Sequence, residues 1–177
     1  MKILLVGEPH SALFEIACYL EEKNDNLNIA PTFNTDMKMQ GVATADRQYY
    51  MSNEEVEVAY KNNAFMWVRS NEHISKGCTM TDLYDNDIFM LSFGDFNNIS
   101  NAVYESMKDD MILCFIDHSK IKYDEDEIYE SQFAAERIYA SKYLYFCDDE
   151  AGEVADVILK YVAGNDIIRN ELLEEFS

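Results

Sequence analysis

Short apolar runs alternate with segments of helical periodicity along this chain. Several runs are apolar at every position, which is typical of strands buried on both faces of a parallel sheet. The runs that predict strands are 2–7, 64–68, 87–93, 111–119 and 142–150. Apolar positions at helical spacing predict helices after the first strand, in 123–141 and in 151–163. This alternation favours an α/β fold, a three-layer parallel sheet with covering helices.

The middle of the chain differs from its two ends. Residues 32–95 hold short strands, one helix and many Asn and Asp residues. The helix is predicted to begin after Ser52, because Glu55 three residues later completes a capping box. We therefore expect a single domain over 1–177, with a core of about 1–31 and 96–163. Residues 32–95 would form an inserted lobe over the carboxyl edge of the sheet, and 164–177 a C-terminal extension with another short helix.

The chain is strongly acidic, with a formal net charge of -20 over 177 residues. This charge argues against direct binding of a nucleic-acid backbone, which needs basic patches. Two interpretations remain open: a charge that serves solubility, or a surface that binds a basic partner or imitates nucleic acid. The candidate acidic surface for a partner consists of Asp124, Glu125, Asp126, Glu127, Asp148, Asp149 and Glu150.

The cysteines and histidines are sparse and unpaired in sequence. None of the four cysteines is in a CxxC pair, and the chain has three histidines, so we expect no metal site and no cofactor. Cys18, Cys114 and Cys147 lie in apolar contexts and are expected to be buried free thiols, which suits a reducing compartment. No stretch is apolar enough for a membrane helix, and the N-terminus lacks a signal-type pattern. We expect a cytoplasmic protein with no membrane partner.

The order of three segments resembles that of guanylate kinases, a family of P-loop nucleoside monophosphate kinases. The first is the opening strand, Gly7, a polar loop and a helix. The second is YYMSNEEVEVAYKNNAFMWV, and the third is ASKYLYFCDDEAGEVADVILKYV, which resembles the family's last core strand, acidic turn and final helix. The resemblance covers about residues 1–163. It implies a P-loop NTPase fold with a small inserted lobe that binds a nucleoside monophosphate.

The resemblance also implies a register for the phosphate-binding loop, whose pattern is GxxxxGK[ST]. The matching residues from the first glycine onward are Gly7, Glu8, Pro9, His10, Ser11, Ala12, Leu13 and Phe14. Ala12 replaces the second glycine, Leu13 the lysine and Phe14 the hydroxyl residue that holds magnesium. Glu8 adds negative charge, and Pro9 removes one backbone donor. A helix N-terminus alone still attracts anions, but we expect no Mg-ATP binding here.

The acceptor side of the resemblance is altered as well. Asp36 and Met39 fall where the family has two arginines, and Lys38 lies between them. Gln48 falls at a phosphate-binding tyrosine, although Tyr49 and Tyr50 follow it. The full set of candidate ligand or partner residues in the lobe is Asp36, Lys38, Tyr49, Tyr50, Arg69, Lys76 and Asp95. The lid region is short and acidic, and Arg137 is interpreted as a surface residue.

These losses lead to a hypothesis about function. Phosphoryl transfer needs cations around the transferred group, and the loss of one such donor already costs roughly 10²–10³ in rate. We expect a catalytically inactive guanylate-kinase-like protein that acts as an acidic protein-binding module. A virus- or phage-encoded inhibitor of a basic or nucleic-acid-binding host factor, working in the host cytoplasm, would have this character. The alternative is a divergent nucleotide kinase or nucleotide sensor, with Lys38, Arg47, Arg69 and Lys76 forming a basic pocket.

Three further groups of residues are open to two interpretations each. His10 and His118 both follow predicted strands and could face one another near Asp117, but turn positions are the favoured interpretation. Trp67 and Phe65 are interpreted as core of the lobe rather than as a stacking platform. The row of Tyr129, Phe133, Glu136 and Ala140 is interpreted as ordinary helix periodicity.

Overall fold

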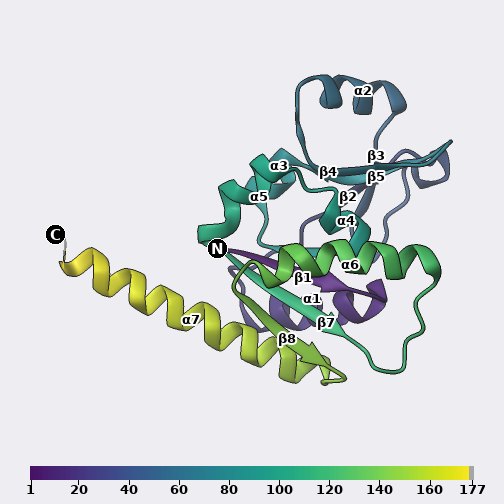
Figure 1. The fold of residues 1–177 in the computed structure, drawn as a ribbon. Helices are drawn as coiled ribbons and strands as arrows, with labels where there is room; N and C mark the ends of the chain where they lie inside the picture. Colours follow the sequence, from purple (N-terminus) through teal and green to yellow (C-terminus); the bar gives the residue numbers. More distant parts are fainter. Residues whose placement is uncertain (176–177) are drawn as a thin grey trace.

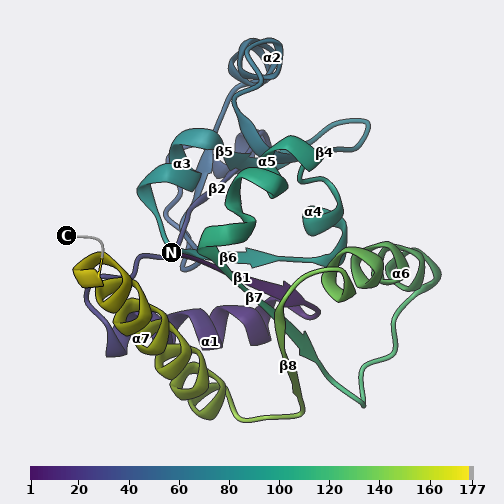
Figure 2. The same ribbon diagram turned by 60° about the vertical axis from the view of Figure 1, so that its left-hand side comes forward.

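The computed structural model describes the backbone of residues 1–175 and the side chains of residues 1–10 and 12–164. Its main sheet has four parallel strands in the order β6-β1-β7-β8; Figure 1 labels β1, β7 and β8, and Figure 2 labels all four. The strands are β1 (Lys2–Gly7), β6 (Ile88–Leu91), β7 (Met111–Asp117) and β8 (Tyr143–Cys147). The predicted α/β fold, a three-layer parallel sheet with covering helices, is confirmed.

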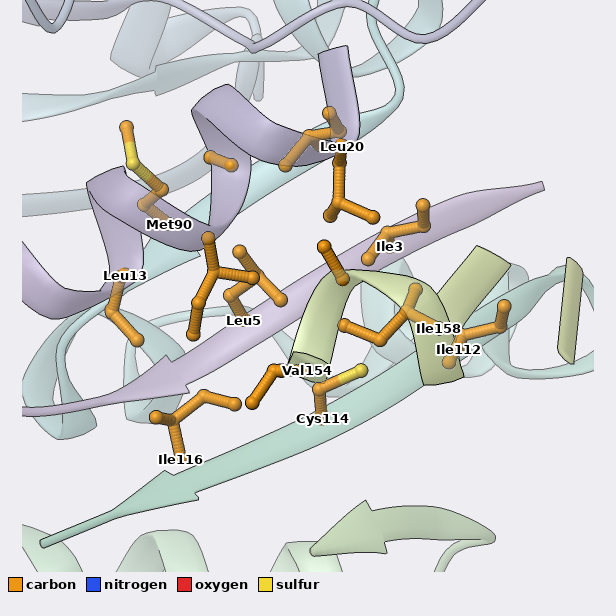
Figure 3. Packing of buried hydrophobic residues seen from close by; sticks show 14 of the residues in the cluster. Ile3, Leu5, Leu13, Leu20, Met90, Ile112, Cys114, Ile116, Val154 and Ile158 are labelled. Atoms are coloured by element: carbon orange, nitrogen blue, oxygen red, sulfur yellow. The ribbon is translucent and has the colours of Figure 1, made fainter. Parts of the chain in front are cut away.

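Strand β1 is buried on both faces, which explains why its sequence has no polar position after Lys2. Ile3 and Leu5 point to one face, where α1 (His10–Lys23) and α7 (Ala151–Glu175) pack (Figure 3). Leu4 and Val6 point to the other face. That face is covered by α4 (Phe93–Asn97), α5 (Asn101–Met107) and α6 (Glu125–Tyr139). Figure 2 shows the two helix layers on opposite sides of the sheet.

The lobe is a second four-stranded sheet, in the order β3-β2-β5-β4. The elements of the lobe are β2 (Thr32–Asn34), η1 (Met37–Met39), β3 (Gln48–Tyr50), α2 (Asn53–Lys61), β4 (Phe65–Ser70), β5 (Ser75–Thr79) and α3 (Met80–Asp85). Outside the lobe, the short helix η2 (Lys108–Asp110) leads into β7. Trp67 is buried in the same cluster as Leu4 and Val6, and the Phe65 ring lies 5.2 Å from that of Phe33. Trp67 is therefore core, as the sequence indicated, whereas Phe65 is half-buried. Through Trp67 the lobe and the sheet share one hydrophobic cluster.

Two boundaries in the predicted organisation need correction. Strand β6 was assigned to the inserted lobe, but it pairs with β1 in register Ile3↔Ile88 to Val6↔Leu91 and belongs to the main sheet. The lobe therefore ends before β6. Helix α7 continues without a break to Glu175, whereas the sequence predicted a separate short helix in 164–177. The predicted start of α2 is confirmed, because Ser52 and Glu55 form a capping box.

The expectation for the cysteines is partly wrong. Cys114 is buried in β7, but Cys18 is exposed and Cys147 is only half-buried. Cys18 is exposed because the buried face of α1 consists of Leu13, Ile16, Ala17 and Leu20, and residue 18 lies to one side of it. Within the described residues, every helix is too short or too polar to cross a bilayer.

Candidate functional site

The junction between β1 and α1 is very short. Only Glu8 and Pro9 separate Gly7, the last residue of β1, from His10, the first residue of α1. Gly7 is explained by strand packing: a Cβ there would lie 2.2 Å from the carbonyl oxygen of Ile116 on β7. The glycine is therefore required by the close approach of two strands and not by a ligand.

The register of a phosphate-binding loop places several of its residues inside α1. Leu13 is fully buried and points toward the sheet (Figure 3), and Phe14 packs against the edge of the same cluster. His10 Nε2 lies 3.6 Å from Asp46 Oδ2. Ala12 is half-buried, and the side chain of Ser11 lies outside the described ones. Leu13 and Phe14, at the lysine and magnesium positions, thus serve the hydrophobic core.

Glu8 occupies the start of this junction in an unfavourable electrostatic environment. Its partial burial, followed by repulsion from Glu127, Asp95 and Glu130, raises the pKa of Glu8 to about 7. The backbone N–H of Phe93 opposes the shift by hydrogen bonding to the carboxylate. In the part of the chain with described side chains, no group of three or more His, Cys, Asp or Glu residues is arranged to hold a metal ion.

Arg69 is the cation of this site, and it comes from the lobe. Its Nη2 lies 2.8 Å from Glu130 Oε1 on α6, and its Nη1 lies 3.3 Å from Asp95 Oδ1 on α4. A Cβ on Gly94 would meet the guanidinium at 2.5 Å, so glycine gives it room over α4. Burial raises the pKa of Asp95, whereas Ser92 and Arg69 favour the ionised form. Arg69 thus joins the lobe to two helices of the core through internal ion pairs.

Of the other candidate residues of the lobe, Lys76 lies opposite Arg69 in the register of β4 and β5, and Tyr50 lies farther along the same row, beyond Asn34 of β2. Asp36 caps η1 by accepting from the N–H of Lys38, and Lys38 is exposed. The Tyr49 hydroxyl donates to Asp82 at 2.7 Å. Burial of Tyr49, together with this hydrogen bond, raises the pKa of the tyrosine. Tyr50 is half-buried and Lys76 is exposed. Among the seven predicted residues, a side-chain ion pair joins Arg69 to Asp95, and a side-chain-to-backbone hydrogen bond joins Asp36 to Lys38.

The basic pocket proposed as an alternative does not form. Arg47 forms a bidentate ion pair with Glu21 on α1, including an Nη1–Oε2 distance of 2.7 Å. This contact lowers the pKa of Glu21. Arg69 lies opposite Lys76 in the register of β4 and β5, but it binds Asp95 and Glu130, whereas Arg47 binds Glu21 on a different helix, so the four cations do not gather as one group.

The two predicted acidic runs lie at the same end of the sheet. Asp124 caps α6 in a capping box with Glu127, and Glu125 and Asp126 lie in its first turn. Asp148, Asp149 and Glu150 form the turn from β8 to α7 and are exposed. The loop from β7 to α6 connects the runs, because the N–H and Oγ of Ser119 both donate to Asp148. These hydrogen bonds lower the pKa of Asp148.

His10 and His118 do not form a pair. His118 Nδ1 lies 3.9 Å from Asp148 Oδ1, whereas His10 lies beside Asp46. Asp117 instead accepts from the Tyr145 hydroxyl at 2.9 Å and the Tyr123 hydroxyl at 3.3 Å. The two histidines therefore have separate partners. His118 follows β7 in a loop, as the favoured interpretation held, but His10 is the first residue of α1 and not a turn residue.

Helix α6 contains a feature that the sequence interpretation missed. Tyr129 and Phe133 belong to a row that was assigned to ordinary periodicity, but 62% and 50% of these residues are exposed. The buried residues of α6 are Ala134 and Ile138. Arg137 is also not a simple surface residue, since it donates to the carbonyl oxygens of Phe96 and Ile99 at 2.9 Å. A signal was present in the sequence: Tyr129 and Phe133 form a second apolar face of α6, separate from the buried face of Ala134 and Ile138.

Comparisons with known proteins bear on the fold. No protein-family model and no curated protein matches the chain. Among solved structures, 57 chains are similar to it. A guanylate kinase from Anaplasma phagocytophilum aligns over 93% of this chain and 85% of its own, with a TM-score of 0.60 and 17% identity. The chain has a guanylate-kinase-like fold. Because the identity is 17%, this similarity shows the fold alone.

In this guanylate-kinase-like fold the carboxyl edge of the sheet is where a ligand is expected, as in other open α/β sheets. Here an acidic residue is found at or after the carboxyl end of each main strand. Glu8 follows β1, Asp95 follows β6, Asp117 ends β7 and Asp148 follows β8. We call these four residues and the two acidic runs the acidic edge.

Proposed function

We propose that this chain is a guanylate-kinase-like protein without catalytic activity, which binds a basic protein partner. The observation that carries the proposal is the acidic edge: a carboxylate accompanies the end of every strand of the main sheet. Glu127, Asp95 and Glu130 lie close enough to Glu8 to add to the rise of its pKa at the β1–α1 junction. A nucleotide phosphate would meet repulsion at this place.

The contacts of the cations support the absence of phosphoryl transfer. Charge accumulates on the phosphoryl oxygens during transfer, and catalysis depends on preorganised cations to stabilise it. Arg69 is bound to Asp95 and Glu130, and Arg47 is bound to Glu21. Leu13 is fully buried in the core, so its side chain does not reach the carboxyl edge of the sheet. No cofactor is needed for the proposed role.

The charge of the edge also indicates the kind of partner. Exposed carboxylates of one sign attract a basic surface over several ångströms and accelerate its association. They repel nucleic acid, so a direct nucleic-acid partner is excluded from the proposal. A basic, nucleic-acid-binding protein is the partner that fits. An inhibitor encoded by a virus or phage, acting on such a host factor in the cytoplasm, would use this surface.

The competing hypothesis is a divergent nucleoside monophosphate kinase or a nucleotide sensor. It requires a cationic site, and the two lobe arginines that could form one are held by carboxylates. Titration with nucleotides separates the two hypotheses, because a saturable rise in melting temperature would support a nucleotide site.

The proposal is tested by capture of binding proteins at low and high salt, with a charge-neutralised variant. The variant carries Glu125→Gln, Asp126→Asn and Glu150→Gln, which are exposed and make no capping contact. The matched control carries Glu54→Gln, Glu72→Gln and Asp85→Asn, three exposed acids of the lobe. We expect basic proteins to be retained at low salt and released at high salt.

The purified partner should associate about tenfold more slowly with the neutralised variant than with the control. Equal loss of binding in both variants would show that net charge alone matters. Retained proteins with no excess of basic residues would contradict the proposal.

A further inference from the structure

Helix α6 has a solvent-facing aromatic stripe. Tyr129 and Phe133 lie four residues apart, with ring centroids 4.9 Å apart in an edge-to-face arrangement. Ile128 beside them is also exposed. Glu125 precedes this pair by one turn and Glu136 follows it by one turn, and both are exposed. The stripe therefore combines apolar rings with carboxylates at its two ends.

The stripe is not needed for the packing of α6 against the sheet. Ala134 and Ile138 already fill the core side of the helix, and Arg137 fastens it to the end of α4. Exposed aromatic rings lose the free energy that burial would give, and apolar patches on soluble proteins commonly mark interaction sites. The stripe is thus available to a partner without disturbing the fold.

A groove runs along the stripe between α4 and α6. Its volume is about 530 Å³, and its walls include Gly94 and Asn97 on α4 and Tyr129, Phe133 and Glu136 on α6. Glu130 and Arg137 also line it, but Glu130 is bound to Arg69 and Arg137 to the α4 carbonyls. Among the described residues that line the groove, Glu136 is the charged one whose side chain makes no ion pair or hydrogen bond.

We propose that this groove binds an amphipathic segment of a basic protein, which inserts an apolar side chain beside Phe133 and stacks an arginine on the Tyr129–Phe133 pair. The inference rests on the proposed function and names the contact surface for its partner. Charge complementarity supports this occupant. The ring faces attract a guanidinium, Glu136 and Glu125 supply counter-charges, and the net charge of -20 disfavours a second copy of the chain. The acidic edge steers the partner, and the aromatic pair anchors it.

Two labelled synthetic peptides test this inference by fluorescence anisotropy. The first has about 18 residues with arginine and leucine at helical spacing, and the second has serine in place of each leucine. Both have the same charge, so they separate anchoring from electrostatic attraction. We expect the arginine–leucine peptide to bind the unaltered protein more tightly than the arginine–serine peptide.

Point variants locate the binding surface. Phe133→Ala and Tyr129→Ala should each weaken the arginine–leucine peptide about tenfold, and should weaken the arginine–serine peptide by a smaller factor, because that peptide loses only the stacked arginine. Tyr84→Ala is the matched control, because Tyr84 is an exposed tyrosine of the lobe. All three side chains are exposed, so the melting temperatures should stay close to that of the unaltered protein. Equal affinities of Phe133→Ala and Tyr84→Ala would overturn the inference.

A charge-neutralised variant that keeps Glu125 and carries only Asp126→Asn and Glu150→Gln distinguishes this inference from the proposed function. If neutralisation weakens both peptides and Phe133→Ala weakens neither, the acidic module stands and the groove is wrong. If Phe133→Ala weakens binding and neutralisation has no effect, the groove stands and the acidic edge does not recruit the partner. Failure of both peptides to bind the unaltered protein at low salt would overturn both.

Discussion

Among the residues of the acidic edge, Glu8 has a raised pKa that links the free energy of unfolding to pH. Burial and three nearby carboxylates raise its pKa from 4.5 to about 7. A carboxyl group with a raised pKa in the folded state stabilises the protein when it is protonated. Its contribution is therefore fully present below about pH 4.5 and is lost as the pH rises through about 7.

Glu8→Gln should remove this pH dependence. At pH 8 we expect the variant to be about 1 kcal/mol more stable than the unaltered protein, a value discounted for partial exposure to solvent. At pH 4 the two should be equally stable. Urea unfolding at the two pH values measures the difference, with Glu54→Gln as an exposed control. A constant difference between Glu8→Gln and the unaltered protein across this range would contradict the assignment.

A substitution at Leu13 tests whether one lysine is enough to make the β1–α1 junction bind a phosphate. Leu13→Lys would place an ammonium group in a fully buried, apolar position. We expect a loss of about 3–5 kcal/mol of stability or failure to fold, and no gain of ATP binding. Leu13→Met is the control, because it keeps volume and costs about 1 kcal/mol. A stable Leu13→Lys protein that binds ATP would contradict the assignment of Leu13 to the hydrophobic core alone.

At the level of elements, the ion pairs of Arg69 form a polar contact between the lobe and two helices of the core. Arg69 joins β4 to α4 through Asp95 and to α6 through Glu130. Here the protein supplies both the cation and the anions, which favours a lobe held in one position.

Arg69→Met should loosen the lobe. The loss of the guanidinium leaves Asp95 buried without its cation, at a cost of about 1–3 kcal/mol, because the arginine is partly exposed. Hydrogen exchange should accelerate in β2, β3, β4 and β5 more than in the main sheet. Lys61→Met, which removes an exposed pair with Glu57, is the control. Unchanged exchange in the lobe would show that Arg69 does not fasten it.

The elements that the sequence predicted well are those with a local signal. The apolar runs of β1 and β7 and the capping box of α2 each depend on neighbouring residues alone. The sheet to which β6 belongs depends on a partner strand far away in sequence, so it was assigned to the wrong part of the fold. The long α7 was divided at Gly164, although a single glycine costs a helix only about 1 kcal/mol.

The candidate site was less predictable than the fold. Arg69 and Asp95 were named, but the role of Glu130 was not, because it follows from the way α6 packs over the sheet. The exposed stripe on α6 has the same periodicity as a core face, and periodicity does not tell which face is covered. The clue that could have been used was an acidic residue at the end of each predicted strand, since parallel strands bring those ends together.

At the level of the whole molecule, the net charge of -20 should make stability depend on salt. Repulsion among carboxylates disfavours the compact state, and salt screens it within a Debye length of about 10 Å at 0.1 M. We expect the melting temperature to rise from low salt to about 0.2 M sodium chloride and then to level off. A melting temperature that falls over this range would mean that attractive ion pairs, such as those of Arg69, outweigh the repulsion.

The most direct test of the central claim is a thermal-shift titration with Mg-ATP, GMP and the deoxynucleoside monophosphates, with sodium chloride controls of matched ionic strength. A ligand at about 100 times its Kd adds about 2.7 kcal/mol to stability, which raises the melting temperature by several degrees. Because carboxylates accompany every strand end of the main sheet, we predict no shift beyond that of the salt controls. A saturable rise with any of these nucleotides would contradict the account and identify the chain as a nucleotide-binding protein.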